Sequence, residues 1–225
     1  MKKYAISDIH GHLKTFNLLL DTIGFTPKDE LYILGDMVDR GLYSKEVLDK
    51  LMEMQQSGLK VFCLMGNHEK MFLNAIENPI DRVYWIKYGG AQTAISFGLD
   101  FGNFSVPERY VHFLRNLPTH FEVDDYILTH AGLNFKSDDP LSDTEAMLWI
   151  RDWHDSVDAD FLGDRIIVHG HSPRKRDFIL NQLENIDSDQ VLDIDNGCCY
   201  NHPGFNHLCA FNMTDKEVVF VKNVG

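Results

Sequence analysis

Short apolar segments rich in strand-forming residues alternate with amphipathic helical patterns in the first third of the chain. Strands are predicted at 4–6, 31–34 and 61–65, and each of them ends in a polar cluster. Between them, apolar residues recur every three or four positions over 13–23 and 44–54, which is the spacing of one buried helix face. This repetition of strand, helix and strand predicts a parallel sheet with right-handed crossovers.

Further strand patterns follow at 126–128, 165–168, 191–194, 207–211 and 218–221. We expect the last three to be antiparallel strands, and the C-terminal third to be mostly sheet. The region from about 79 to 117 is typical of a helical cap or insertion, and no Gly/Ser-rich linker sets it apart. The pattern therefore predicts a single α/β domain over 1–225.

Composition narrows the class of protein further. The 225 residues are 44% hydrophobic and carry a formal net charge of −13, a field that repels nucleic-acid backbones and anionic lipids. No apolar run approaches the ~20 residues of a membrane helix, and Tyr4-Ala5-Ile6 is too short for a signal-peptide core. The four cysteines lack a CxxC pair. We expect a cytoplasmic protein with no nucleic-acid or membrane partner.

The polar clusters at the predicted strand ends hold carboxylate, imidazole and carboxamide groups. They are Asp8-Ile9-His10-Gly11, Gly35-Asp36-Met37-Val38-Asp39-Arg40-Gly41, Gly66-Asn67-His68-Glu69, His130-Ala131-Gly132 and His169-Gly170-His171. Loops at the carboxyl ends of parallel strands form the ligand crevice of an α/β sheet, so the five clusters should meet there. Oxygen and imidazole donors without thiolate suit Mn, Fe or Zn, and Asp36 could bridge two such ions. Asp8 and His10 would project to the same side if the chain stays extended between them.

These clusters resemble the motifs of metal-dependent phosphoesterases of the phosphoprotein phosphatase type, in their compact bacterial form. The family pattern is D-x-H-G, G-D-x-x-D-R-G, G-N-H-E, H-A-G and G-H, and twelve fixed positions of the first three motifs match in order. The resemblance extends through Trp149-Ile150-Arg151-Asp152 to Asp195-Asn196-Gly197. Asp152 stands where the family usually has Glu, and Asn196 stands where it has Thr. The resemblance implies a mixed β-sandwich flanked by helices, in four αββα layers.

The resemblance also implies a role for each matching residue. Asp8, His10 and Asp36 would hold one divalent ion, and Asp36, Asn67, His130 and His171 a second. The ions, Mn first and Fe or Zn as alternatives, would present a bridging hydroxide to the phosphorus. Arg40 and Arg151 would bind the phosphate, since a guanidinium pairs its donors with phosphate oxygens. His68, oriented by Asp39, would protonate the leaving group.

Three functions remain open. The first is a serine/threonine phosphoprotein phosphatase, a phosphoric monoester hydrolase acting on a phosphorylated protein or a small phosphoester. The alternative is a bis(5'-nucleosyl)-tetraphosphatase, because that related group shares the same ligands but usually lacks the Asp that Asp39 supplies. The third is a non-catalytic, metal-dependent module that binds phosphoproteins. Cysteine-dependent phosphatases are excluded, because no cysteine is followed by Arg at the C-x5-R spacing.

Overall fold

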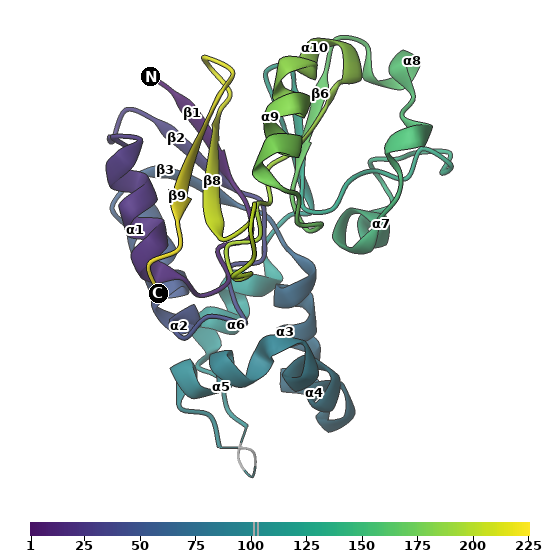
Figure 1. Cartoon of the computed structure of the whole chain (residues 1–225). Helices are drawn as coiled ribbons and strands as arrows, with labels where there is room; N and C mark the ends of the chain where they lie inside the picture. Colours follow the sequence, from purple (N-terminus) through teal and green to yellow (C-terminus); the bar gives the residue numbers. More distant parts are fainter. Residues whose placement is uncertain (101, 103) are drawn as a thin grey trace.

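A computed structural model of the chain describes residues 1–100, 102 and 104–225, and its strands form two sheets (Figure 1). The first sheet has the order β3-β2-β1-β8-β9. Its strands are β1 (Lys3–Ile6), β2 (Glu30–Ile33), β3 (Lys60–Cys63), β8 (His207–Asn212) and β9 (Glu217–Lys222). The first three are parallel, as predicted, while β8 and β9 complete the sheet as an antiparallel hairpin.

The second sheet has the order β4-β5-β6-β7. Its strands are β4 (His120–Val123), β5 (Tyr126–Thr129), β6 (Ile166–His169) and β7 (Val191–Asp193). The expectation that 191–194 is antiparallel was wrong, because β7 pairs with β6 in parallel. β4, which has no clear apolar pattern, was not predicted.

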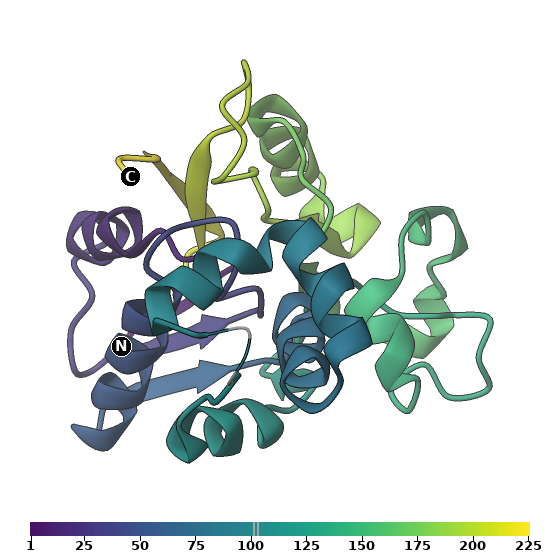
Figure 2. The same cartoon turned by 90° about the horizontal axis from the view of Figure 1, so that it is seen from below.

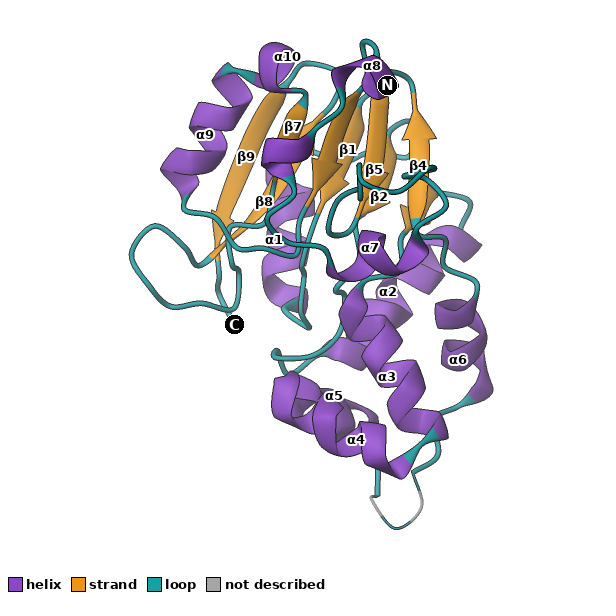
Figure 3. Cartoon of the chain, turned by 90° about the vertical axis from the view of Figure 1, so that its right-hand side faces the viewer, coloured by secondary structure: helices purple, strands orange, loops and turns teal. Residues whose placement is uncertain are grey.

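The helices of the described chain cover the outer faces of the sheets and extend below them (Figures 1 and 3). They are α1 (Leu13–Thr22), α2 (Ser44–Gln56), α3 (Asn67–Glu77), α4 (Pro79–Trp85), α5 (Ala91–Phe97), α6 (Glu108–Arg115), α7 (Thr144–Trp149), α8 (Ala159–Leu162), α9 (Arg176–Glu184) and α10 (Ile186–Asp189). A kinked turn over Ile86–Gly90 joins α4 to α5.

Alternation along the strands separates the apolar core into layers. In β1, Tyr4 and Ile6 pack with α1 and α2, whereas Ala5 faces residues of the second sheet. In β5, Leu128 faces the first sheet and Ile127 packs with the layer of α7 and α8. These faces give the order helix, sheet, sheet, helix, so the predicted mixed α/β sandwich flanked by helices is confirmed.

The C-terminal third of the chain also differs from the sequence prediction. The C-terminal third is not mostly sheet, since α8, α9 and α10 lie within it. A strand parallel to its predecessor needs a crossover, and α9 and α10 supply it between β6 and β7. The sequence pattern of α9 is weak because Ile179 is its one buried residue among those described.

Helices do occupy most of the region predicted as a cap, from α4 to α6, and they face the viewer in the view from below (Figure 2). Phe101 and Asn103, within the same predicted region, lie outside the described residues. No helix in the described part of the chain is both long and apolar enough to cross a membrane.

Candidate metal centre

The five loops that follow β1, β2, β3, β5 and β6 meet at one place. The Nδ1 atom of His130 lies 2.8 Å from the carbonyl oxygen of Leu34. The backbone N–H of His171 donates to Asp8 Oδ2 at 3.1 Å. The loops after β2 and β3 touch at two glycines. A Cβ on Gly35, whose φ is +91°, would lie 2.6 Å from the Cα of Gly66. The predicted convergence of the five clusters is therefore confirmed.

The site loops hold several non-glycine residues in the left-handed region of backbone space. Among them are Asp8 (φ 52°), His10 (φ 46°), Asp36 (φ 49°) and His171 (φ 71°). A residue held in this way costs on the order of 1–3 kcal/mol, so the fold sustains strain here. The chain is not extended from Asp8 to His10, so the condition under which their side chains would project to the same side is not met. The backbone N–H of His10 donates instead to the Asp36 carbonyl at 2.8 Å, which turns the chain across the next loop.

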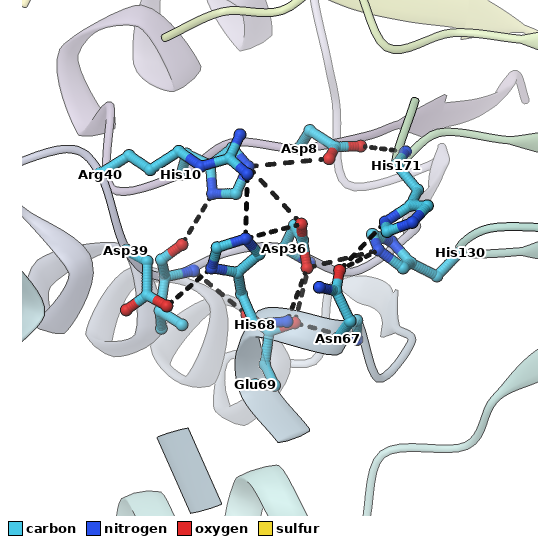
Figure 4. Close-up of polar contacts among 12 residues, drawn as sticks. Asp8, His10, Asp36, Asp39, Arg40, Asn67, His68, Glu69, His130 and His171 are labelled. Carbon is cyan, nitrogen blue, oxygen red and sulfur yellow. Dashed lines mark hydrogen bonds and ion pairs between the residues drawn. The ribbon is translucent and has the colours of Figure 1, made fainter. Parts of the chain in front are cut away.

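The carboxylate of Asp36 lies between two clusters of possible metal ligands (Figure 4). Its Oδ2 is 3.5 Å from His10 Nε2, and its Oδ1 is 3.4 Å from His130 Nε2. One cluster joins Asp36 to His10 and His68, and the other joins it to His130 and His171. Each oxygen of one carboxylate therefore faces its own cluster, which is the arrangement a bridging ligand requires.

The other predicted ligands border these clusters. Asp8 Oδ1 lies 3.7 Å from His10 Nε2. Asn67 Oδ1 lies 2.9 Å from His130 Nε2 and 3.1 Å from His171 Nδ1. The Nε2 atoms of His10 and His171 are buried and have no hydrogen-bond partner among the described residues. Buried polar atoms are normally satisfied, so these two nitrogens fit a cation between the side chains.

Burial shifts the pKa values of these groups towards their neutral forms. It raises the pKa of Asp36 well above its usual range, and the neighbouring carboxylates of Asp8 and Glu69 act in the same direction. Burial also lowers the pKa of His171 to about 2, with His130 and Arg151 contributing. Neutral imidazoles can ligate a metal at once, and a bound cation would stabilise Asp36 in its ionised form.

Glu69 organises the loop that carries Asp36, a role that the sequence analysis did not assign. Its fully buried carboxylate accepts hydrogen bonds from four backbone N–H groups, those of Asp36 (2.8 Å), Met37 (2.8 Å), Val38 (3.1 Å) and Gly66 (2.9 Å). Charge-assisted bonds of this kind are stronger than neutral ones. The G-N-H-E motif was the available indication of this role, because Glu69 is its fourth residue and was not proposed as a ligand.

His68 and Asp39 form the pair that the motif resemblance implies. Nδ1 of His68 lies 2.7 Å from Asp39 Oδ2. Asp39 is fully buried and also accepts from Trp85 Nε1 (2.9 and 3.0 Å) and from Thr93 Oγ1 (2.7 Å). Trp85 and Thr93 come from the helical region, and no motif identified them. Trp85 is itself fully buried.

Arg40 and Arg151 lie on the wall of one pocket of about 410 Å³, together with Asn67, His68 and His171. Nη2 of Arg40 is 3.0 Å from His68 Nε2, and its Nη1 donates to Cys199 Sγ at 3.4 Å. Nη1 of the exposed Arg151 donates to Ser172 Oγ at 2.8 Å. All ten predicted site residues thus lie in or beside this pocket and the clusters behind it.

The two departures from the family motifs have different surroundings. Asn196 uses its Nδ2 to donate to the carbonyls of Arg174 (2.8 Å) and Gly204 (2.9 Å), which ties together the loops on either side of it. A threonine could not donate twice, so the carboxamide has a structural use here. Asp152 is exposed, and nothing in the structure explains its replacement of Glu.

The family model of calcineurin-like phosphoesterases matches residues 1–213. The chain belongs to this family. The match covers all five loops described above. A calcineurin-like phosphoesterase uses divalent metals, and the donor set around Asp36 is consistent with that chemistry.

Curated relatives in the family include tetraphosphatases. The chain is 26% identical to the bis(5'-nucleosyl)-tetraphosphatase PrpE [asymmetrical] of Bacillus velezensis, over 97% of this chain and 91% of that enzyme. It is 32% identical to the symmetrical bis(5'-nucleosyl)-tetraphosphatase of Nitrosomonas europaea, over 59% of this chain and 45% of that enzyme. The chain thus spans less than half of that symmetrical relative but most of PrpE.

Solved structures share the fold of this calcineurin-like phosphoesterase. A protein serine/threonine phosphatase from Saccharomyces cerevisiae aligns with a TM-score of 0.66 at 16% identity, over 100% of this chain and 81% of that one. A cold-active protein tyrosine phosphatase aligns with a TM-score of 0.66 at 18% identity, over 99% of this chain and 79% of that one. At these identities the likeness shows the fold alone.

Proposed function

We propose that this calcineurin-like phosphoesterase hydrolyses dinucleoside polyphosphates, the alternative that the sequence analysis placed second. The similarity to PrpE carries this proposal, because it extends over nearly the full length of both chains. The similarity to the symmetrical tetraphosphatases points to the same substrate class. The pocket is consistent with this substrate class, because two arginines, residues of the candidate metal clusters and aromatic side chains line it together.

In this proposal Asp8, His10 and Asp36 would hold one divalent ion, and Asp36, Asn67, His130 and His171 would hold a second. Such ions supply Lewis-acid activation of water and neutralise phosphate charge. Arg40 and Arg151 bind non-bridging phosphate oxygens through paired N–H donors. Once Arg40 binds the phosphate, His68 would donate a proton from Nε2 to the departing oxygen, while Asp39 keeps the ring oriented through Nδ1. Mn²⁺ is the ion to test first, with Fe and Zn as alternatives.

A serine/threonine phosphoprotein phosphatase, the first function considered above, is the second candidate. The buried pair of His68 and Asp39 favours it, because an alkoxide is a poor leaving group and needs a proton in the transition state. The leaving group of a phosphoanhydride is a phosphate oxygen of much lower basicity, so the anhydride reaction depends less on this acid. The two candidates therefore differ in what they demand of His68.

The deciding experiment assays the Mn²⁺-loaded protein on equal concentrations of diadenosine tetraphosphate and of phosphoserine, phosphothreonine and phosphotyrosine peptides. We expect the highest kcat/KM on diadenosine tetraphosphate. Chromatography of the products separates asymmetrical cleavage, which yields ATP and AMP, from symmetrical cleavage, which yields two ADP.

A higher kcat/KM on the phosphoserine or phosphothreonine peptides would replace the first proposal by the second candidate. Binding of a phosphopeptide without turnover of any of these substrates would leave only the non-catalytic module.

A further inference from the structure

The pocket beside the candidate metal clusters has a second wall that the proposed reaction does not use. Tyr84 of α4, Tyr88 of the kinked turn and Trp149 at the end of α7 belong to it, and they line the same pocket as Arg40 and Arg151. The three aromatic residues come from separate elements of the fold. Aromatic rings therefore lie within one pocket of the groups proposed to bind phosphate.

These rings are exposed to solvent. Tyr84 is 62% exposed, Tyr88 54% and Trp149 37%. Within the described residues their side chains make no hydrogen bond and no ring-to-ring contact, in contrast to Trp85, which stacks on Phe72 and bonds to Asp39. Exposed apolar groups that gather in one hollow mark binding sites more often than scattered ones do.

Resting on the proposed function, we propose that Tyr84, Tyr88 and Trp149 form a stacking site for the base of a nucleotide whose phosphate lies against Arg40 and Arg151. Every nucleobase presents a flat π-face. Stacking of this face on an aromatic side chain stabilises the bound nucleotide, whichever base it carries. Asn74 and Asp81 also line the pocket and offer hydrogen-bond partners to amino or hydroxyl groups of a nucleoside. The site would thus select a nucleotide over a simple phosphate ester.

The test compares two ligands that differ only in the base, AMP and ribose 5-phosphate, by isothermal titration calorimetry on the Mn²⁺-loaded protein. We expect AMP to bind at least about fivefold more tightly, the lower end of base stacking on an aromatic side chain. Tyr84→Ala and Tyr88→Ala should each weaken AMP binding by about fivefold or more and leave ribose 5-phosphate within about twofold.

Matched controls separate the rings from a general effect on the fold. Tyr84→Phe and Tyr88→Phe keep the ring and should bind AMP like the unmodified protein. Val83→Ala changes a neighbour of Tyr84 that is 71% exposed and lines a different hollow, so AMP binding should not change. These variants alter exposed side chains and leave the core intact.

Equal affinity for AMP and ribose 5-phosphate, or alanine variants that still bind AMP fully, would overturn the stacking site. An aromatic phosphopeptide that loses affinity in the alanine variants while AMP does not would also overturn it, in favour of a peptide pocket. A different measurement tests the proposed function, which would be refuted if diadenosine tetraphosphate were not hydrolysed. The binding of AMP and ribose 5-phosphate could still be compared by calorimetry in that case.

Discussion

The Nδ1 atom of His68 lies 2.7 Å from Oδ2 of Asp39, and both side chains are almost completely buried. Trp85 and Thr93 donate to the same carboxylate. The carboxylate is therefore held by two further donors, and Nε2 of His68 lies 3.0 Å from Nη2 of Arg40, which lines the same pocket. This arrangement suits a proton donor whose direction is set by the helical region of the chain.

Replacing His68 by asparagine tests that role through the leaving group. We expect turnover of a phosphoserine peptide to fall by about 10²- to 10⁴-fold, because general acid catalysis contributes on that order. Turnover of p-nitrophenyl phosphate, whose leaving group needs little protonation, should fall much less. Metal content, measured by elemental analysis, should stay the same. Equal losses on both esters would contradict the acid role.

Thr93→Val tests whether the helical region positions Asp39. The variant keeps the shape of the side chain but removes the hydroxyl that donates to Asp39 Oδ1 at 2.7 Å. We expect it to lower phosphoserine turnover more than p-nitrophenyl phosphate turnover, and to lower the free energy of unfolding by about 1–3 kcal/mol. Thr93→Ser keeps the hydroxyl and is the matched control. A stability loss with an unchanged ratio of the two activities would indicate a purely structural role.

The sequence was most informative where short motifs follow buried strands. Asp8, Asp36, Asn67 and His130 were predicted to meet because each follows a parallel strand, and the rule about carboxyl strand ends does not depend on side-chain detail. The left-handed backbone at Asp8 and His10 was not predicted. That conformation depends on hydrogen bonds to a different loop, which no local pattern encodes.

Other contributions to the site come from long-range contacts without a motif. Thr93 is 54 positions from Asp39, and Trp85 is 46 positions from it. An isolated threonine or tryptophan in a helical segment is usually a core residue, so sequence alone cannot distinguish it from a residue that supports the site. The parallel pairing of β7 was missed for a related reason, because the weak pattern of α9 hid the crossover that it requires.

Asp36→Asn tests the bridging role proposed for this carboxylate. We expect the variant to lose both ions together, because each carboxylate oxygen faces a different ligand cluster and an amide offers only one acceptor oxygen. Elemental analysis after dialysis measures the metal content. Asp138→Asn, on an exposed loop, is the control. Two ions retained by Asp36→Asn would refute bridging.

The raised pKa of Asp36 gives the effect of metal a definite pH dependence. Burial raises this pKa, so in metal-free protein the folded state keeps a proton that the unfolded state releases above about pH 4. The contribution of Asp36 to the free energy of unfolding therefore falls as pH rises through its folded pKa. A bound cation stabilises the ionised carboxylate and removes this loss.

The difference in Tm between Mn²⁺-loaded and EDTA-treated protein should consequently be larger at about pH 7.5 than at about pH 5.5. Histidines that protonate in the unfolded state affect both samples equally and cancel in the difference. Differential scanning calorimetry at the two pH values measures it. A difference that does not grow between the two pH values would show that Asp36 is already ionised without metal.

Glu69→Gln tests the residue that organises the Asp36 loop. Four backbone N–H groups donate to this buried carboxylate, and an amide replaces one acceptor oxygen by a donor that faces N–H groups. We expect the free energy of unfolding in EDTA to fall by about 3 kcal/mol, since a buried donor left unpaired carries its desolvation cost. Metal binding should weaken as well, because the loop no longer holds Asp36 between the two clusters. Glu77→Gln, at the exposed end of α3, is the matched control and should stay within about 0.5 kcal/mol. If urea denaturation gave the same change for both variants, the four hydrogen bonds of Glu69 would not be what maintains the loop.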